Sequence, residues 1–492
     1  MKFMKFAPNL IRIAERTAFA VLTAYGLYTA FFFFHDAYFK IFFPYMTNLG
    51  EPSMAQAIMT FQKGIWPYHD LRNPPYCLVP YGPVYLWLGA ASYHFFQGPF
   101  AGPRFVAFAA TALTALLIFL ILRKNAVKPL PALVSALFFL SHPYVQRWNA
   151  QVNVDMTGVF FSAAAFYFLF CFSSENFRPK IFLIAGILMN VAAFFTKSSM
   201  VACPAVFFVY LLFRRRFKLA LGFWVAQALP IGLIYLWLNH ATEGQYFFHT
   251  TYEISKRLYF WQFLYRFWID ASIATTLPVL VTLFFLIFEG FRKKIDLIYI
   301  YVLFSVLMTV SLGKQGSDTN YLLEWCVTSS LALGILLRDF SGSAARGILW
   351  ILMLIQMFHW GGVKSLDTAH QWNEERKAFY ENVSLLIRKT PGKILSEDMG
   401  ILIANGREIF YEPFPMGQMS YSGAWDERII LDILNRREFS LAILYFYAPV
   451  LRQSRTFTQN FLDTFVKNYR FIGRTEIPGT GGQQLFFYAP KK

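Results

Sequence analysis

Long blocks of apolar residues limit what this chain can fold into. Residues 19–34 read FAVLTAYGLYTAFFFF and residues 105–125 read FVAFAATALTALLIFLILRKN. A helix that crosses the hydrocarbon core of a bilayer needs about 20 predominantly apolar residues, and several blocks reach that length. Only 15% of the residues are charged, against about 25% in an average soluble domain. The sequence therefore predicts an integral membrane protein.

The first apolar block is predicted to be an uncleaved span. A long basic lead, MKFMKFAPNLIRIAER, precedes it, and bulky Phe residues stand where signal-peptide cleavage needs small side chains. The hydropathy pattern of the whole chain predicts eleven spans. They lie near residues 13–34, 104–122, 130–143, 154–173, 180–196, 199–213, 218–238, 273–290, 296–312, 322–338 and 347–363.

Basic residues predict the orientation of these spans. With a cytoplasmic N-terminus, the inner loops are RKNAVK, ENFRPK, RRRFK, FRKK and RDFSGSAAR, and each is basic, as the positive-inside rule requires. Residues 84–96 are too short to cross and are expected to lie along the outer surface as a helix. The outer connections are then 35–100, 143–153, 239–272, 313–321 and the tail after Gly362.

The same topology explains the formal charge of +17 without a nucleic-acid partner, because the cytoplasmic loops collect Lys and Arg. The four cysteines, Cys77, Cys171, Cys203 and Cys326, are scattered and form no CxxC pair or obvious disulfide framework, so we expect them to be packing residues.

The composition changes near Lys364 and divides the chain in two. Residues 1–363 are predicted to be an α-helical transmembrane module, with about eleven membrane helices and further helices at the outer interface. Residues 364–492 are predicted to be a small soluble extracytoplasmic α/β domain. In that domain HQWNEERKAFYENVSLLIRKTPG and RIILDILNRREF read as helices, KILSED and SLAILYFY as strands, and the last residues as two strands joined by a glycine turn.

The first outer loop is unusually rigid and polar. Glu51 is followed by Pro52, a residue that suits the first turn of a helix, and a carboxylate there is kept ionised by the helix dipole. Met54, Ile58 and Phe61 recur at helical spacing, so this helix is expected to lie on the bilayer with that face down. The prolines of GIWPYHDLRNPPYCLVPYGP hold the backbone that follows.

This loop resembles the first extracytoplasmic loop of GT-C-fold glycosyltransferases, polytopic enzymes that take sugars from polyprenyl-phosphate or polyprenyl-diphosphate carriers. The likeness lies in an acid after the first span, then G-x-x-P-Y-x-D, then Y-G-P at the start of a helix. In this chain those elements are Glu51, then Gly64, Pro67, Tyr68 and Asp70, then Tyr81, Gly82 and Pro83. The bacterial members usually have Asp-Glu at the first position, where this chain has Gly50-Glu51.

Other segments on the same side resemble the family too. NVDMTGVFF places Asp155 at the start of a span, and FFTKSSMVAC places Lys197 between two spans. The late segment GKQGSDTNYLLEW resembles the family's G-x-D-x-N-Y loop and supplies Asp318, Asn320 and Tyr321. The order of these motifs along the chain and their common side support the resemblance.

The resemblance implies transfer of a sugar to an acceptor hydroxyl at the outer face, with inversion at the anomeric carbon. The donor already carries a phosphate leaving group, so one carboxylate that takes the acceptor proton suffices. Glu51 is the first choice for this base and Asp70 the second. Cations must steady the leaving phosphate, and the candidates are Arg72, Arg104, Arg147, Lys197, Lys256, Arg257 and Lys314.

Several roles stay open. Tyr68 and Tyr81 either stack on sugar faces or belong to the aromatic belt at the membrane interface. A divalent metal ion is left open, because some relatives use one but the chain has no HExxH motif or dense carboxylate cluster. In the tail, Asp398, Tyr411 and Glu412 either face the membrane site or are ordinary structural residues.

The expected partners are a polyprenyl-phosphate-linked sugar, a lipid, glycan or protein acceptor, and membrane lipids, with the chain in the inner membrane of a bacterium. Two alternatives remain. A transporter or flippase for lipid-linked glycans would be expected to show inverted repeats and polar residues near mid-membrane, whereas here the acids gather at one face. Gly50, where the family has Asp, is compatible with an inactive relative that acts as an assembly partner.

Overall fold

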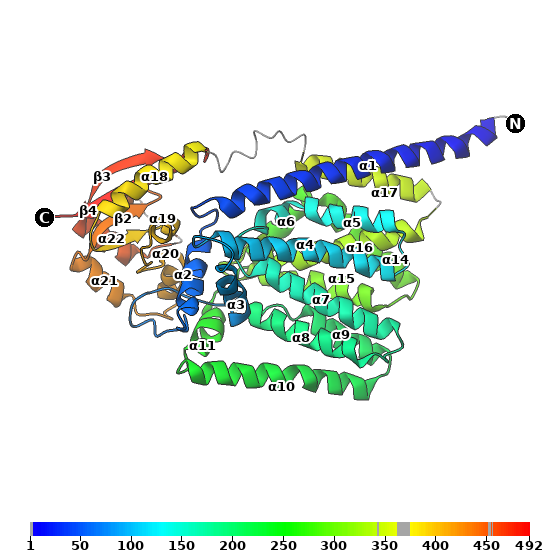
Figure 1. The fold of residues 1–492 in the computed structure, drawn as a ribbon, viewed down its shortest axis with the longest axis horizontal. Coiled ribbons are helices and arrows are strands. Elements are labelled where there is room, and N and C mark those ends of the chain that lie inside the picture. Colours follow the sequence, from blue (N-terminus) through cyan, green and yellow to red (C-terminus); the bar gives the residue numbers. More distant parts are fainter. Residues whose placement is uncertain (1–2, 342–343, 362–373, 451–453, 455) are drawn as a thin grey trace.

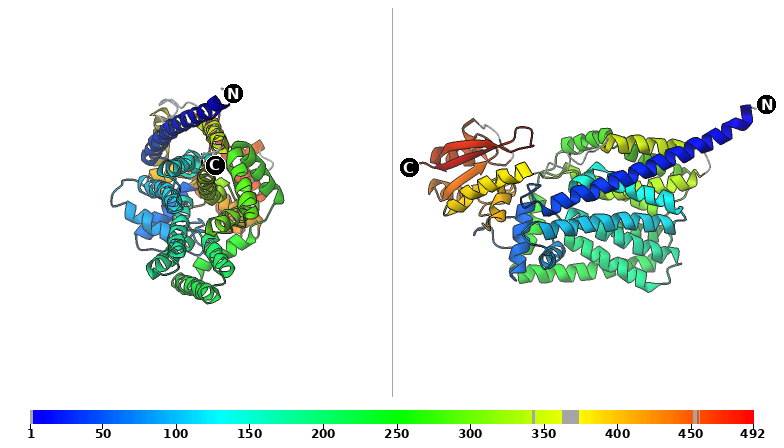
Figure 2. Two further views of the ribbon diagram at one scale, coloured as in Figure 1. Left: turned by 90° about the vertical axis from the view of Figure 1, so that its right-hand side faces the viewer. Right: turned by 45° about the horizontal axis from the view of Figure 1, so that its top comes forward.

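A helix bundle with a small mixed domain at one end makes up the molecule (Figure 1). The computed structural model describes residues 3–341, 344–361, 374–450, 454 and 456–492, with side chains from Arg16 onward. The free end of α1 lies at the end of the bundle opposite to the domain, as Figure 1 and the right-hand view of Figure 2 show. The end that carries the domain is called the domain end below.

The apolar helices run roughly along the length of the bundle. Among the described residues, five helices are each long and apolar enough to cross a membrane, and a bent helix pair is a sixth candidate. Each predicted span coincides with an apolar helix. These are α1 (Phe3–Phe42), α4 (Ala101–Lys124), α5 (Pro129–Ser141), α7 (Asp155–Ser174), α8 (Lys180–Thr196), α9 (Ala202–Phe213), α10 (Phe217–Ala241), α14 (Thr276–Phe291), α15 (Leu297–Met308), α16 (Leu323–Asp339) and α17 (Ala344–Gly361).

The burial of these helices distinguishes the core from the lipid-facing edge. In the stretch Thr319–Asp339, which ends with α16, 94% of the most apolar window is buried, so this helix is enclosed by its neighbours. In α10 the corresponding share is 17%, and large side chains such as Leu229 and Trp237 point outward. A helix that is apolar on all sides must be covered by protein or by lipid, so the exposed side of α10 indicates a membrane-facing surface. The chain is a multi-pass membrane protein.

Short elements connect the spans at the domain end and near it. They are α6 (Pro143–Trp148), α11 (Gln245–Phe247), the π-helix η1 (Phe248–Tyr252), α12 (Glu253–Lys256), α13 (Trp261–Ala274), and the 3-10 helices η2 (Thr309–Gly313) and η3 (Thr319–Leu322). The axis of α13 turns by 102° into α14. Trp261, Tyr265 and Ile273 of α13 are exposed along one side at helical spacing.

The helix α2 (Glu51–Gln62) is placed differently from the sequence expectation. It starts at Glu51 with Pro52 in its first turn, as predicted, but all residues from Glu51 to Ile58 are buried inside the protein. Ile58 packs against Gly89 of α3 (Pro83–Ser92). The expectation that the Met54 and Ile58 face lies on the bilayer is therefore wrong, because protein side chains cover that face. The helix α3 is short, as predicted for residues 84–96.

The domain at the end contains a four-stranded sheet in the order β1-β2-β4-β3. Its strands β1 and β2 are parallel, and the other two pairs are antiparallel. The predicted strands and the two predicted helices of this region are present. The elements are α18 (Glu374–Lys389), β1 (Lys393–Ser396), α19 (Met399–Ala404), α20 (Pro413–Tyr421), α21 (Arg428–Asn435), β2 (Phe439–Leu444), η5 (Ala448–Val450), α22 (Gln459–Asn468), β3 (Tyr469–Glu476) and β4 (Gln484–Pro490). The predicted domain boundary at 363/364 lies outside the described residues.

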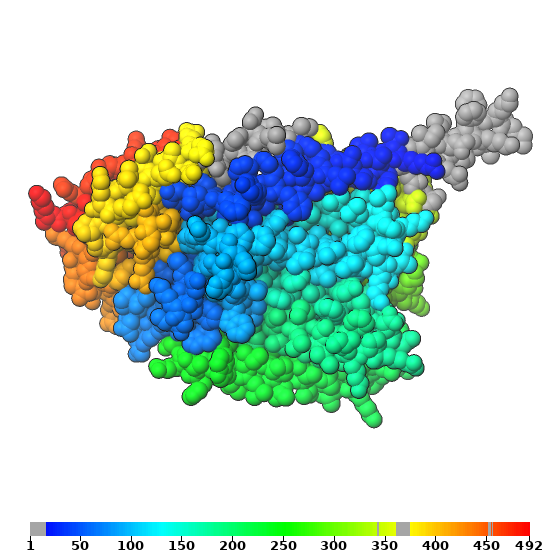
Figure 3. All heavy atoms as spheres, viewed as in Figure 1, coloured from blue at the N-terminus to red at the C-terminus, as the bar shows by residue number. Residues whose placement is uncertain are grey.

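The proline-rich loop after α2 is fixed by this domain. The Gln56 side chain exchanges two hydrogen bonds with the backbone of Ile409, at 3.2 and 2.6 Å. Tyr76 and Tyr411 form a parallel backbone bridge. The space-filling view shows the domain packed closely against the blue first-loop segment (Figure 3). The prolines therefore restrict a loop that is held by the bundle on one side and by the domain on the other.

We predict that Gly82→Ala destabilises the junction between α3 and α8. A Cβ at residue 82 would lie 2.1 Å from the carbonyl oxygen of Phe195, a backbone atom that cannot move aside easily. Overpacking of this kind costs about 1–3 kcal/mol, so the melting temperature of the detergent-solubilised protein should fall. Gly222→Ala is the control, because nothing lies within 4 Å of its added Cβ. Equal melting temperatures of the two variants would contradict the prediction.

Candidate active site

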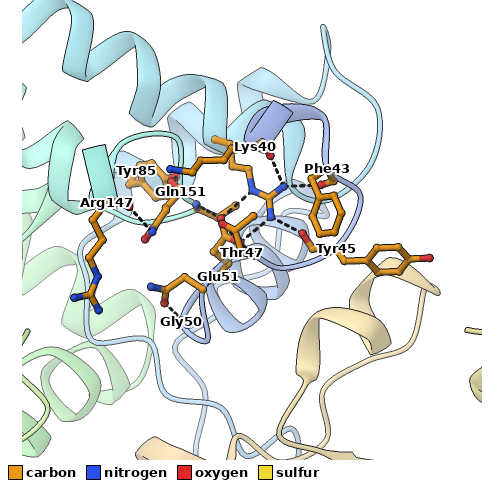
Figure 4. Close-up of polar contacts among 12 residues, drawn as sticks. Lys40, Phe43, Tyr45, Thr47, Gly50, Glu51, Tyr85, Arg147 and Gln151 are labelled. Carbon is orange, nitrogen blue, oxygen red and sulfur yellow. Dashed lines mark hydrogen bonds and ion pairs between the residues drawn. The ribbon is translucent and has the colours of Figure 1, made fainter. Parts of the chain in front are cut away.

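A buried ion pair between Glu51 and Arg104 ties α2 to α4 (Figure 4). Arg104 donates from Nε to Glu51 Oε1 at 2.9 Å and from Nη2 to Oε2 at 2.7 Å. Its remaining N–H groups donate to the carbonyls of Lys40, Phe43 and Tyr45, which follow the first span. Both side chains are almost fully buried, at 1% and 0% exposed. The pair therefore joins the end of α1, the start of α2 and the start of α4.

The oxygens of Glu51 accept further hydrogen bonds. Oε2 accepts from the N–H and the hydroxyl of Thr47, at 2.6 and 3.0 Å, and Oε1 accepts from the N–H of Val152 at 2.9 Å. Burial alone would raise the pKa of Glu51, but the Arg104 charge and these hydrogen bonds outweigh it and lower the pKa. The carboxylate is thus ionised, closed off and already saturated with donors.

The sequence suggested that Glu51 is a base within reach of water, but the structure buries its carboxylate. A general base must come within hydrogen-bond reach of the proton that it takes, and both oxygens of Glu51 are occupied by protein donors. Arg104 likewise donates all of its N–H groups to protein acceptors. The preceding residue, Gly50, offers no carboxylate, and its N–H donates to Asn48 Oδ1 at 3.0 Å. In the geometry that the structure shows, Glu51 and Arg104 hold three chain segments together.

A second polar group lies where α7 begins and α8 ends. Lys197 Nζ donates to Asp155 Oδ1 at 2.6 Å, and Asn320 Nδ2 donates to the same oxygen at 2.9 Å. The ammonium of Lys197 lies 4.1 Å from the centre of the Tyr321 ring. Tyr81 is close enough for the charges of Asp155 and Lys197 to act on its hydroxyl. These five residues, Tyr81, Asp155, Lys197, Asn320 and Tyr321, are called the Asp155 cluster below.

The positions of helix ends explain why these distant residues meet. Asp155 is the first residue of α7, where the helix dipole favours a negative charge. Lys197 follows directly after the last residue of α8, where that dipole favours a positive charge. Because α7 and α8 pack side by side, both ends come to the same level of the bundle. The pair is almost fully buried, with side-chain exposures of 1% for Asp155 and 5% for Lys197.

Hydrogen bonds and an ion pair join two loops beside the cluster. Arg147 Nη2 donates to Asp318 Oδ2 at 2.7 Å, Trp148 Nε1 donates to Thr319 Oγ1 at 3.0 Å, and Asn320 bonds Asp155. The segment 147–155 therefore lies against η3 and the residue before it. Arg147 and Asp318 are half exposed. This ion pair forms an accessible rim next to a buried interior.

A cation from the connection after α10 also approaches the cluster. Arg257 makes a two-pronged ion pair with the buried carboxylate of Glu253, through Nε at 3.0 Å and Nη2 at 2.9 Å. Its charge acts on the hydroxyl of Tyr81. Burial, reinforced by Asp155, raises the pKa of Tyr81 to about 12, so its hydroxyl stays protonated at neutral pH. Sequence analysis named Arg257 as one of seven candidate cations, and no motif pointed to its partner Glu253.

Other residues chosen from the sequence lie elsewhere. Asp70 is paired with the exposed Arg72 at 2.6 Å and lines a separate pocket of about 310 Å³; its described contacts do not reach the Asp155 cluster. The hydrogen bond from Arg72 is the main reason that the pKa of Asp70 is lowered. Tyr68 is buried and donates its hydroxyl to the carbonyl of Tyr81 at 2.7 Å. Tyr68 therefore holds the backbone of Tyr81, a member of the Asp155 cluster, in place.

The three candidates of the C-terminal domain are structural in their described contacts. Glu412 accepts hydrogen bonds from the hydroxyl of Ser53 and from the N–H of Leu78, so it fastens the domain to the first loop. Asp398 accepts from the Tyr380 hydroxyl at 2.9 Å. Tyr411 is buried within the domain core. Burial raises the pKa of Glu412 to about 7 against the opposing effect of its hydrogen bonds.

Within the described part of the chain, no group of three or more His, Cys, Asp or Glu side chains is arranged to hold a metal ion. The carboxylate of Asp155 is bonded to an ammonium and an amide instead.

The helix bundle with its domain-end site and appended mixed domain has the GT-C fold of polytopic membrane glycosyltransferases. ArnT from Cupriavidus metallidurans, solved with bound undecaprenyl phosphate, is similar with a TM-score of 0.59 and 11% identity, over 96% of this chain and 97% of ArnT. The oligosaccharyltransferase of Archaeoglobus fulgidus is similar with a TM-score of 0.58 and 12% identity, over 96% of this chain and 74% of that chain.

Sequence comparison points the same way. Residues 79–238 match the family model described as dolichyl-phosphate-mannose-protein mannosyltransferase. The match runs from the proline-rich loop into α10 and so includes Tyr81, Asp155 and Lys197. No curated protein sequence matches the chain. The fold and the family match confirm the resemblance to GT-C-fold glycosyltransferases that the sequence motifs indicated.

We predict that the Glu51–Arg104 pair is essential for stability as a pair. Arg104→Met leaves an unpaired carboxylate in a buried site, and removal of one partner of a buried ion pair typically costs about 3–5 kcal/mol. Glu51→Gln should be destabilising for the complementary reason. The double variant Glu51→Gln/Arg104→Met should recover part of the loss, which a double-mutant cycle of melting temperatures measures. Additive losses would show that the pair is not coupled.

We predict that Glu412 makes the stability of the folded protein depend on pH. The folded-state pKa of about 7 lies above the ordinary value of 4.5, so the bound proton stabilises the fold fully below pH 4.5 and this contribution disappears as the pH rises through 7. Glu412→Gln cannot titrate, so its melting temperature should fall less than that of the wild type between about pH 5 and pH 8. The exposed Glu408→Gln is the control and should follow the wild type.

Proposed function

We propose that the chain transfers a glycosyl group from a polyprenyl-phosphate or polyprenyl-diphosphate carrier to an acceptor hydroxyl, at the outer face of a bacterial inner membrane. The GT-C fold and the match to a mannosyltransferase family support glycosyl transfer from a lipid carrier. The observation that carries the proposal is the Asp155 cluster, in which the first loop, the α6–α7 loop, the end of α8 and η3 bring a carboxylate, a cation and phenols together.

Asp155 is the proposed general base. Lys197 and Asn320 both bond its Oδ1, whereas Oδ2 has no hydrogen-bond partner. Oδ2 is buried, so an acceptor must first move the side chains that cover it, but its hydroxyl can then bond Oδ2 without breaking an existing hydrogen bond. The proton of that hydroxyl can pass to Oδ2 as the hydroxyl attacks the anomeric carbon. An acceptor hydroxyl could bond Glu51 only by breaking hydrogen bonds that its oxygens already accept. Asp70 lies in a separate pocket. Asp155 is therefore preferred to both as the base.

The leaving phosphate is proposed to meet cations at the edge of the cluster. Arg147 and Arg257 each present a guanidinium beside the cluster, one on its half-exposed rim and one near Tyr81. Charge builds on the carrier phosphate as the bond to the sugar breaks, and arginine forks stabilise phosphate oxygens through paired hydrogen bonds. The phosphate needs no proton to leave. Attack from the side opposite to the phosphate inverts the anomeric carbon.

We predict that Asp155→Asn abolishes transfer but keeps carrier binding. Loss of a general base typically costs a factor of about 100–10,000 in rate. The assay follows labelled sugar from undecaprenyl-phosphate mannose or glucose into envelope glycolipids or glycans in proteoliposomes, and carrier retention is measured in parallel. Asp70→Asn is the matched control and should transfer at the wild-type rate.

Full transfer by Asp155→Asn, or loss of transfer in Asp70→Asn alone, would refute the assignment of the base. A wild-type protein that moves the sugar-bearing lipid across the vesicle membrane without transferring the sugar would instead favour the transporter.

The proposed placement of the C-terminal domain outside the cytoplasm is checked by cysteine labelling of a surface residue of that domain in intact cells.

A further inference from the structure

Buried polar atoms without a hydrogen-bond partner gather on one short segment of the chain. Residues 149–157 hold six of the fifteen such side-chain atoms found in the described residues, and Asn320, which bonds Asp155, holds a seventh. Native proteins leave few buried polar atoms unpaired, so a concentration of them needs an explanation. The seven atoms are Asn149 Oδ1 and Nδ2, Gln151 Oε1, Asn153 Oδ1, Asp155 Oδ2, Thr157 Oγ1 and Asn320 Oδ1.

Nearly all of these atoms are oxygens, and the orientation of two amides is fixed. Gln151 donates from Nε2 to the carbonyl of Arg147 at 2.6 Å, as Figure 4 shows. Asn320 donates from Nδ2 to the Asp155 carboxylate. Because a carbonyl and a carboxylate only accept hydrogen bonds, each amide must turn its nitrogen toward them and leave its oxygen unpaired. The group that pairs with these oxygens must therefore be a donor.

Thr157 is exceptional among the buried threonines. In the helices of this chain, buried threonine hydroxyls such as those of Thr111, Thr114 and Thr196 donate to the carbonyl four residues earlier. Thr157 lies in the first turn of α7 and makes no such bond, although it is only 1% exposed. Its hydroxyl is available to another group.

The segment that carries these atoms is held firmly at both ends. The N–H of Val152 donates to Glu51, Trp148 donates to Thr319, and Asp155 is bonded to Lys197 and Asn320. The unpaired atoms are therefore held in position by the ion pair of Glu51 and by η3. A preorganised set of polar atoms costs stability in the free protein and is repaid when a ligand pairs with them.

We propose that this set, apart from Asp155 Oδ2, which is kept for the acceptor hydroxyl, binds the hydroxyl groups of the sugar on the lipid carrier. The inference rests on the proposed function and names the chemistry of its donor: a neutral sugar with several free hydroxyls. Sugar hydroxyls donate hydrogen bonds, whereas the phosphate that links sugar and carrier only accepts them. The oxygens of Asn149, Gln151 and Asn320 therefore suit the sugar, and Arg147 and Arg257 suit the phosphate. The sugar sits beside Asp155, where the acceptor hydroxyl must attack.

The test compares carriers with and without a sugar. The full-length protein in lipid nanodiscs is titrated with undecaprenyl phosphate and with its glucose, mannose and galactose conjugates. At least one conjugate should bind about tenfold or more tightly than the bare carrier. Asn149→Leu and Thr157→Val should each reduce that gain by about fivefold, the value of one neutral hydrogen bond, and should leave the affinity for bare carrier unchanged.

Stability separates this role from a structural one. Replacing an unpaired buried polar group by an apolar group of similar shape is neutral or stabilising, so both variants should melt at or above the wild-type temperature while they lose the sugar-dependent gain. Asn190→Leu is the matched control: both amide atoms of Asn190 are also unpaired and buried, but it lies within α8. It should show the same change in melting temperature and keep the full gain.

Three results would overturn the inference. One is that no conjugate binds more tightly than the bare carrier, and another is that both variants keep the full gain. The third is that Mg²⁺ or Mn²⁺ alone raises the melting temperature of the wild type but not of the variants, without any sugar-dependent gain, which would assign the oxygens to a metal. If neither the bare carrier nor any conjugate binds, the proposed function fails as well.

Discussion

The ion pair between Glu51 and Arg104 is the contact on which the rest of the domain end depends. Arg104 donates to the carbonyls of Phe43 and Tyr45, which follow the first span. Glu51, the first residue of α2, accepts from the N–H of Val152. A fully desolvated pair of this kind is favourable only when every donor and acceptor is satisfied. The structure satisfies them with backbone groups of residues 40–47 and of Val152 and with the hydroxyl of Thr47. The pair therefore fixes the relative positions of two loops that are about a hundred residues apart in sequence.

One of those loops carries the proposed chemistry. Because Val152 is held by Glu51, the segment from Asn149 to Asp155 has a defined path between α6 and α7. That path brings Asp155 to Lys197 and lets η3 lie alongside. Glu51, the first choice for the base from the sequence, thus holds the loop that carries the proposed base, Asp155.

The sequence predicted the fold well because the membrane imposes strong constraints. Apolar blocks such as 105–125 leave few choices besides a spanning helix, and the elements of the C-terminal domain followed from alternating patterns and glycine turns. Motifs at the ends of spans also named Asp155, Lys197, Asn320 and Tyr321, one by one, as candidates on the outer side, and the structure brings the four together. Their roles in binding stay a prediction.

The sequence could not show which side of α2 is covered by protein or how Glu51 is paired. Both depend on long-range contacts: the face of Met54 and Ile58 is covered by α3 and the C-terminal domain, and the partner of Glu51 is 53 positions away. An acid at the start of a helix gives the same sequence pattern whether its carboxylate faces water or a guanidinium. The unpaired Asn149 and Thr157 carried no sequence signal, because polar residues near a span end are common and only the structure reveals which ones lack partners.

The sharp turn between α13 and α14 bears on how the protein sits in its bilayer. The α13 helix crosses the direction of the bundle with Trp261, Tyr265 and Ile273 exposed, and aromatic side chains favour the level of the lipid headgroups. A bilayer that is thinner or thicker than the bundle would pull this helix up or down relative to the spans. Since α13 joins the stretch that holds Arg257, lipid thickness is a physical variable to which the domain end of this protein is mechanically connected.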